Sequence, residues 1–254
     1  MNVPTIQKIF NMKTIPTSKS KIRTGVIEVE EAKAWQHQMW QLYSCYYDVD
    51  QAAFFKRMDS NDYYAIYTKN EELVGFTGLR LRPFDLEGEE VMTLYLGQTV
   101  LRSDCRGRSL MPRTCSLLFA QHFLKHPTMP IYAWCDSLTY KPYLLFSNSL
   151  KNSYPSRKEE TPAKVKMLID KLGNHYYQDS YDPETGTVHK QANIIDDPSA
   201  TITEADRQKN ADIDFFAKAN PGHASGHGLI TIAPINFTNF LFLVKKCFKK
   251  QFAR

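Results

Sequence analysis

The sequence has few cysteines and no long hydrophobic run. Its 254 residues include 5 cysteines, with no Cys-x-x-Cys pair. This argues against a disulfide scaffold or a thiolate zinc cluster, and favours a reducing compartment such as the cytoplasm. The longest aliphatic and aromatic run, Phe240 to Val244, is far shorter than the roughly 20 residues of a membrane-spanning helix. The N-terminus has no apolar stretch typical of a secretory signal. No transmembrane segment is therefore expected.

The chain also lacks an overall excess of charge outside its C-terminus. The formal net charge is +5. Residues 241–254 contain no acid, and their five bases are Lys245, Lys246, Lys249, Lys250 and Arg254. The rest of the chain is neutral, so no field steers it toward a polyanion and no nucleic-acid partner is expected. The hydrophobic content of 43% is sufficient for a sizeable core.

Hydrophobic periodicity predicts helices and strands in alternation. Helices are predicted at 31–47, 51–58, 109–125, 140–150, 203–218 and from 236 onward, and Asn236 is the expected N-cap of the last. Strands are predicted within the first 24 residues and at 63–68, 73–82, 91–101, 131–135, 187–194 and 229–233. Residues 83–88 are expected to form a loop, and residues 151–186 are polar.

An anion-binding turn is predicted where strand 91–101 meets helix 109–125. A helix N-terminus has amide donors without intrahelical partners, and Gly107 lets the backbone approach a ligand closely. Pro112 fits the first helical turn because its missing amide would have no intrahelical partner there. The arginines that could bind phosphate oxygens are Arg106, Arg108 and Arg113. An ordinary turn with solvent-exposed arginines is the alternative.

The segment Arg106-Gly107-Arg108-Ser109-Leu110-Met111 resembles the signature (Arg/Gln)-x-x-Gly-x-(Gly/Ala) of the GNAT superfamily of N-acetyltransferases. That signature binds the pyrophosphate of acetyl-CoA. Ser109 and Met111 stand where the signature has small residues. The order of elements over residues 25–150 is also similar to this superfamily. The resemblance implies an α/β (α+β) fold with a GNAT-like mixed central sheet flanked by helices and an enlarged C-terminal half.

The resemblance also implies a division of one domain, residues 1–254, into three parts. Residues 25–150 would form the acyl-CoA-binding core, 151–226 a polar elaboration, and 227–254 a closing strand and C-terminal helix. The co-substrate would be acetyl-CoA or another acyl-CoA, without a metal. Strand 131–135 would splay away from strand 91–101 to hold the thioester. The implied cofactor-binding residues are Thr99, Val100 and Leu101 for the pantetheine arm, and Arg106, Gly107, Arg108, Ser109, Leu110, Met111 and Arg113 for the pyrophosphate.

By the same resemblance, transfer needs an acid to protonate the leaving thiolate and a base for the amine. A tyrosine on helix 140–150 serves as acid in many relatives, so Tyr143, or else Tyr140, is expected in this role. Glu90 and Asp136 are the candidate bases, although a surface carboxylate is the simpler interpretation of each. A buried tyrosine that only packs is the alternative for the acid, and a water chain is the alternative for the base.

The implied function is transfer of an acetyl or other short acyl group from CoA to a small-molecule or peptide amine. The alternatives are a non-catalytic acyl-CoA-binding or interaction protein, and an enzyme that transfers a different acyl group. A homodimer is possible. The Gly/His segment 220–228 holds His223 and His227 but no nearby third metal ligand, so a loop that lines the acceptor pocket, or a connector, is expected there. The C-terminal helix is expected to pack on the body, with an interfacial or partner-docking helix as the alternative.

Overall fold

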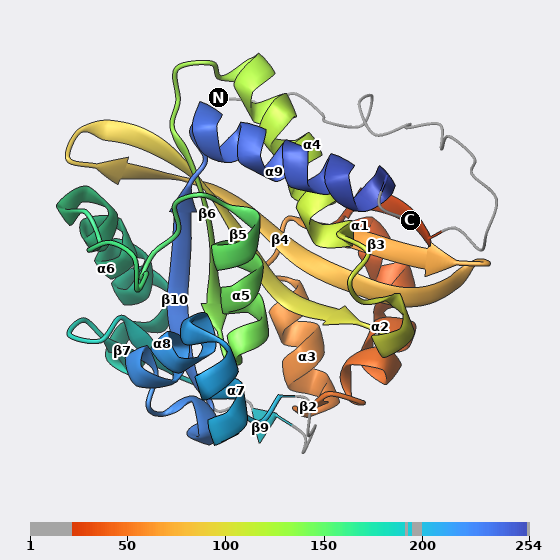
Figure 1. Ribbon diagram of the computed structural model, residues 1–254. Helices are drawn as coiled ribbons and strands as arrows, with labels where there is room; N and C mark the ends of the chain where they lie inside the picture. The colour runs from red at the N-terminus through yellow and green to blue at the C-terminus, as the bar shows by residue number, and fades with distance from the viewer. Residues whose placement is uncertain (1–21, 191–192, 195–199, 253–254) are drawn as a thin grey trace.

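The protein contains an eight-stranded mixed sheet with helices on both faces (Figure 1). The computed structural model describes residues 22–190, 193–194 and 200–252. The first 21 residues, predicted as the lead-in to a strand, lie outside the described residues. The sheet order is β1-β3-β4-β5-β6-β10-β8-β7, and a separate two-stranded sheet pairs β2 with β9. The expected mixed α/β (α+β) class is confirmed.

The strands run nearly throughout the chain. Their bounds are β1 (Ile22–Glu28), β2 (Tyr47–Asp48), β3 (Tyr63–Lys69), β4 (Glu72–Leu86), β5 (Glu89–Leu101), β6 (Ile131–Ser137), β7 (Tyr181–Asp182), β8 (Thr187–His189), β9 (Asn193–Ile194) and β10 (His227–Pro234). Among the paired strands described, β5 and β6 are parallel and the other pairs are antiparallel. The connection between two parallel strands requires a crossover, which α4 provides.

The helices cover both faces of the sheet. Their bounds are α1 (Val29–Ala32), α2 (Gln36–Tyr43), α3 (Gln51–Met58), α4 (Leu110–Lys125), α5 (Tyr140–Ser149), α6 (Ala163–Tyr177), α7 (Glu204–Lys209), α8 (Ala211–Ala219) and α9 (Phe237–Phe252). One face packs against α4, α5 and α9, which lie in front of the strands in Figure 1. The opposite face packs against α2 and α3 over β3 and β4, and against α6 over β6 and β10. The described part of the chain contains no helix that is both long and apolar enough to span a bilayer.

Strand β4 is longer than predicted, because the expected loop at 83–88 continues the β4–β5 hairpin. Pro83 pairs in register with Met92, and only Glu87 and Gly88 form the turn. Pairing of β4 with β3 ends at Leu79, so beyond that residue β4 has β5 as its sole neighbour in the sheet. A proline without an amide is tolerated on such an edge.

Helix α6 lies within residues 151–186, for which the sequence analysis predicts no element. Its buried residues are Val165, Leu168, Ile169, Leu172 and Gly173. Four of them follow the spacing i, i+3, i+4, i+7 of an amphipathic helix, so the signal was present but was hidden in a polar surrounding. Predicted helix 31–47 is divided into α1, a 3₁₀ turn and α2, and predicted helix 203–218 is divided at Asn210. Asn236 is confirmed as the N-cap of α9, since its Oδ1 accepts from the Asn239 amide at 2.9 Å.

Candidate functional site

The two parallel strands part in the middle of the sheet. Strands β5 and β6 pair from Met92–Ile131 to Tyr95–Trp134, and no further pairs join them. Beyond this point β5 continues along β4 as far as Leu101, while β6 continues along β10. The predicted splay of these strands is therefore confirmed. Thr99, Val100 and Leu101 lie on the part of β5 that has separated from β6.

A β-bulge in β5 reverses the direction of the side chains within the splayed part. The register shifts near Gln98, whose φ is 42°. Before the bulge, Tyr95 packs toward α6; after it, Val100 packs toward α2 and α3. Gln98 itself is held against α3, because its Nε2 donates to the Phe54 carbonyl at 3.3 Å. Its Oε1 also accepts from the Tyr64 hydroxyl at 2.5 Å. The bulge thus fixes the end of β5 to the α3 side of the sheet.

The turn between β5 and α4 exposes a set of unpaired main-chain donors. Gly107 has φ 75° and Ser109 has φ 55°, so two left-handed residues bend the chain into the helix. The first helical hydrogen bond runs from the Arg113 amide to the Ser109 carbonyl. Within the described residues, five consecutive amides make no hydrogen bond, those of Gly107, Arg108, Ser109, Leu110 and Met111. A Cβ at Gly107 would have no neighbour within 4 Å, so the turn is open to a ligand.

The three arginines of this turn are placed differently. Arg106 is directed back to the strand: its Nε donates to the Leu101 carbonyl at 2.9 Å, and its guanidinium lies 5.0 Å from the centre of the Tyr46 ring. Arg108 lines the cavity described below and has no hydrogen-bonding or charged partner among the described residues. Arg113 is exposed and is not among the residues that line the cavity.

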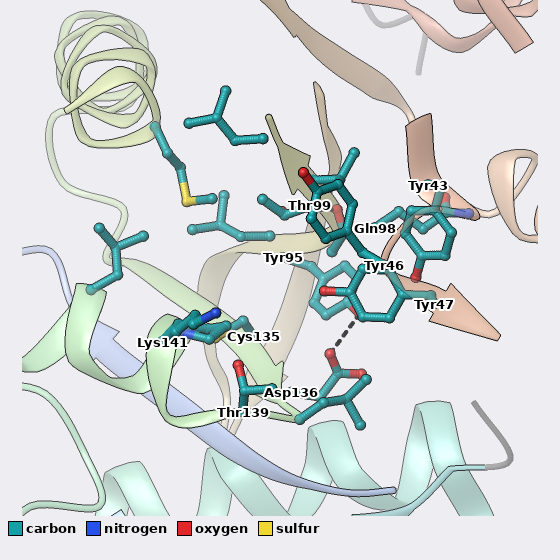
Figure 2. Close-up of a pocket in the computed structure, with 18 of the residues that line it drawn as sticks. Tyr43, Tyr46, Tyr47, Tyr95, Gln98, Thr99, Cys135, Asp136, Thr139 and Lys141 are labelled. Atoms are coloured by element: carbon teal, nitrogen blue, oxygen red, sulfur yellow. Dashed lines mark hydrogen bonds between the residues drawn. The ribbon is translucent and has the colours of Figure 1, made fainter. Parts of the chain in front are cut away.

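A cavity of about 970 Å³ opens beside the parted strands. Its lining comes from both faces of the sheet. The α4–α5 side includes residues 106–112 and Lys141, and the opposite side includes Arg57, Arg80 and Tyr177. In Figure 2 the tyrosines of the α2–β2 region gather on one side of the cavity, and Asp136 and Thr139 lie on the other. A ligand could therefore enter from the α4 turn and reach across the sheet.

Asp136 is the carboxylate nearest to the point where the strands part. It is 9% exposed and follows directly on β6 residue Cys135. Its Oδ1 accepts from the Tyr95 hydroxyl at 3.0 Å, the bond drawn in Figure 2. Its Oδ2 accepts from the Tyr177 hydroxyl and forms an ion pair with Lys190. Burial, followed by the charge of Asp136, raises the pKa of both tyrosines well above the usual value, so both remain proton donors at neutral pH.

The sequence analysis named Asp136 but not its three partners. Tyr177 is the last residue of α6 and comes from the segment 151–186, described only as polar, whereas Lys190 follows β8 and lies within the predicted strand 187–194. For Tyr95 the sequence predicted only a place in strand 91–101. Asp136 lies 41 positions from Tyr95 and from Tyr177 and 54 from Lys190. Such contacts have no local signal, because they depend on the long-range pairing of β6 with β10 and of β10 with β8.

The other predicted catalytic side chains lie outside the cavity lining. The ring of Tyr143 is 1% exposed and packs against Phe215 and Phe216 of α8 at centroid distances of 5.9 and 5.7 Å. Tyr140 packs in the same cluster. Glu90 is exposed and pairs in register with Asp85 near the hairpin turn.

The Gly/His segment 220–228 lies beside β8 and does not line the cavity. Its His227 Nε2 is 2.8 Å from Nδ1 of His189, and His223 Nδ1 is 2.8 Å from the Asn220 carbonyl. Within the described ranges, no group of three His, Cys, Asp or Glu side chains is arranged to hold a metal ion.

Comparisons with known proteins give distant structural likenesses. No family model matches the sequence, and no curated protein matches it. Solved structures do match. One is a probable N-acyltransferase from Enterococcus faecalis (13% identity, TM-score 0.38), where the match covers 49% of this chain but only 31% of that chain. Another is a ribosomal-protein-alanine N-acetyltransferase from Brucella melitensis (11% identity, TM-score 0.37), which covers 50% of this chain and 89% of the other.

A third match is an aminoglycoside acetyltransferase from an uncultured soil metagenomic sample. Its identity is 10% and its TM-score 0.39, and the match covers 56% of this chain and 99% of that chain. A matching structure from Staphylococcus aureus is described as a GNAT family acetyltransferase, the superfamily that the sequence resembles. Each of these three matches covers about half of this chain.

Proposed function

We propose that the protein is an acyl-CoA-dependent N-acyltransferase that moves an acetyl or other short acyl group from CoA to an amine. One observation carries the proposal: five amides without a partner in the described chain belong to residues that line a cavity beside two parted strands. Amides at a helix N-terminus bind phosphate groups, and a parted strand offers main-chain groups to an extended ligand.

The residues of the β5–α4 turn fit a diphosphate. Among the described residues the amides of 107–111 have no hydrogen-bond acceptor, and the N-terminus of the 16-residue helix α4 adds a partial positive charge. Arg108 supplies a full charge that no acid of the described chain neutralises. Met111, which departs from the signature, lines the cavity and its amide is one of the free donors, so its side chain does not close the turn.

The residues beyond the turn fit the rest of the ligand. Thr99 to Leu101 line the cavity on the separated part of β5 and would hold the pantetheine arm. An acyl-CoA supplies an activated thioester whose acyl carbon an amine can attack. Asp136 would hold the acceptor's amine and take its proton, and the buried hydroxyls of Tyr95 and Tyr177 would keep this carboxylate ionised by hydrogen bonding.

The proposal is tested by measuring thermal stability with CoA, acetyl-CoA and pantetheine, which lacks the diphosphate. A ligand at 100 times its dissociation constant stabilises by about 2.7 kcal/mol. CoA and acetyl-CoA are expected to raise the unfolding temperature, and pantetheine much less. No shift at millimolar acetyl-CoA would refute acetyl-CoA as the donor.

Two charge reversals locate the diphosphate. Arg108→Glu places a carboxylate beside the free amides and is expected to abolish the shift with CoA. Arg113→Glu makes the same change one turn further along α4, outside the cavity lining, and is expected to keep most of it. Arg108 precedes the N-cap Ser109 and Arg113 lies near the start of α4, where a negative charge interacts favourably with the helix N-terminus, so neither variant should unfold α4. Equal losses in both variants would show that only general charge matters.

Turnover distinguishes an enzyme from a binding protein. Release of free CoA thiol with an amine panel supports transfer. A stability shift without thiol release would favour the non-catalytic acyl-CoA-binding protein, and thiol release only with longer acyl chains would favour transfer of a different acyl group.

A further inference from the structure

We infer that the acceptor is an amino carboxylate, a small amine that carries a carboxylate bound by Arg80 and Arg57. This inference rests on the proposed function and concerns the end of the cavity opposite the α4 turn. Both arginines line that end. In the described part of the chain neither one has an acidic side chain within ion-pair distance.

Arg80 is fixed in place but is not neutralised. Its Nε donates to the Ser60 carbonyl at 2.7 Å and its Nη2 to the Ser60 hydroxyl at 3.1 Å. The guanidinium lies between the rings of Tyr95 and Tyr176, at 4.8 and 4.6 Å from their centres. Its Nη1 has no hydrogen-bond partner among the described residues. By contrast Arg82, two residues along the same strand, pairs with Asp62.

Arg57 lines the same side of the cavity as Arg80. It lies in the last turn of α3, is half-buried, and forms no side-chain hydrogen bond or ion pair with the described residues. The hydroxyl of Ser60 donates to the Arg57 carbonyl at 2.7 Å and accepts from Arg80, so one serine links the two positions. The guanidinium of Arg80 is fixed and that of Arg57 makes no bond with the described residues, so two arginines on one side of the cavity are available to an anion.

The acids near this end are already engaged or solvated. The Asp50 carboxylate caps α3 by accepting from the Ala53 amide at 2.8 Å. Asp136 is paired with Lys190. Asp48 lines the cavity from an exposed position, where water screens its charge. A neutral amide leaves the negative charge of Asp50 in place, so the case for a carboxylate ligand depends on the guanidinium of Arg80, which has no acid within ion-pair distance among the described residues. A polyamine such as spermidine has no carboxylate to offer this guanidinium.

The spacing of the groups suits a small molecule with an amine and a carboxylate. The ring of Tyr95 stacks on Arg80, and its hydroxyl bonds to Asp136 at 3.0 Å. One tyrosine side chain thus spans the distance from the anion site to the carboxylate that would hold the amine. An amino acid can reach both points, with its carboxylate at Arg80 and Arg57 and its amine toward Asp136.

Binding and turnover are measured with phenylalanine, alanine and glutamate, each beside its α-carboxamide, and with spermidine, in the presence of acetyl-CoA or CoA. The carboxamide removes the charge and makes the amine less basic, so chemistry alone would favour it at neutral pH. A preference for the free amino acid would therefore report recognition of the carboxylate. The binding arm uses calorimetry with CoA present, and it is decisive without turnover.

Two neighbouring substitutions provide the matched pair. Arg57→Met and Lys56→Met remove the same charge from the same turn of α3, but Lys56 is exposed and does not line the cavity. Arg57→Met is expected to raise the KM or Kd of the preferred amino acid about tenfold to a hundredfold. Its kcat for the amino acid, and its KM or Kd for the carboxamide, are expected to stay unchanged. Lys56→Met is expected to change none of these constants.

Equal or better use of the carboxamides or of spermidine would overturn the inference and leave the acyltransferase proposal intact. So would calorimetry in which none of the three amino acids binds. Binding of an amino acid that depends on Arg57, without any thiol release, would support the anion site and contradict only the enzymatic proposal. Loss of the shift with CoA in wild-type protein would instead refute the proposed function itself.

Discussion

The closest steric restriction near the site is at Gly97, two residues beyond the last pair of β5 with β6. A Cβ at this position would lie 2.1 Å from Cε1 of Tyr95 and 2.6 Å from its hydroxyl oxygen. The Tyr95 ring would have to move, although it is wedged between Arg80 and Trp134. Gly97→Ala should therefore separate the Tyr95 hydroxyl from Asp136.

The magnitude follows from the bond that is lost. A hydrogen bond to a charged group contributes about 1.5–3 kcal/mol, so Gly97→Ala should cost about 2 kcal/mol or more. For a chain of this size, each kcal/mol corresponds to about 2–4 °C in Tm, which gives a fall of about 4–8 °C by calorimetry or circular dichroism. Acyl transfer should fall as well, because Asp136 loses a hydrogen-bond donor.

Two comparisons make the result decisive. Gly25→Ala, on edge strand β1, introduces a Cβ with nothing within 4 Å and should leave Tm unchanged or slightly higher. In a Tyr95→Leu background, which lacks the ring, Gly97→Ala should cost much less than in the wild type. A Gly97→Ala protein with wild-type Tm and activity, or equal costs in both backgrounds, would refute the steric argument.

Further predictions concern the tyrosines. Tyr177→Phe should lower kcat, because it removes a hydrogen-bond donor to Asp136. Tyr143→Phe should leave kcat within about twofold, because that ring packs on α8 outside the cavity. A larger loss of kcat in Tyr143→Phe than in Tyr177→Phe would restore Tyr143 as the acid. Alkaline unfolding provides another test. Burial raises the pKa of Tyr95 and Tyr177, so the folded protein keeps protons that the unfolded chain loses. The free energy of unfolding should therefore be unaffected by these groups below about pH 10 and fall above it. Tm measured between pH 9 and 11 should fall less steeply in Tyr177→Phe, and an unchanged slope would contradict this reasoning.

Much of the phosphate end could be predicted from sequence, because its determinants are local. A strand, a glycine and a proline in the first helical turn lie within residues 91–113, and the turn with free amides formed where it was expected. The parting of β5 and β6 was implied by the resemblance to the GNAT superfamily, and the strand pairing confirms it. What local sequence could not give is the direction of each arginine: Arg106 turns back to Leu101 and Arg113 faces solvent.

The acceptor end could not be predicted in the same way. Asp136 was named as one of two carboxylates, but the choice of it over Glu90 depends on the sheet order that buries one and exposes the other. Tyr177 reaches Asp136 through α6, which the polar composition of 151–186 concealed. Lys190 follows β8, which lies in the strand predicted at 187–194, but its contact with Asp136 depends on the sheet order. The bulge at Gln98 could not be predicted from a glycine, because glutamine is the residue that takes the positive φ there.

Two stretches of the chain that lie far apart in sequence contribute to the lining of the cavity. Residues 97–112 supply the amides and the splayed strand, whereas Tyr176, Tyr177 and Lys190 come from a later stretch that joins the sheet through β8 and β10. Substitutions in that later stretch can reshape what is recognised next to Asp136 without disturbing the free amides of the α4 turn. In the proposed arrangement Arg57, Arg80 and Asp136 also precede residue 150, so chimeras exchanged there would keep these groups and the α4 turn from one parent and take only Tyr176, Tyr177 and Lys190 from the other.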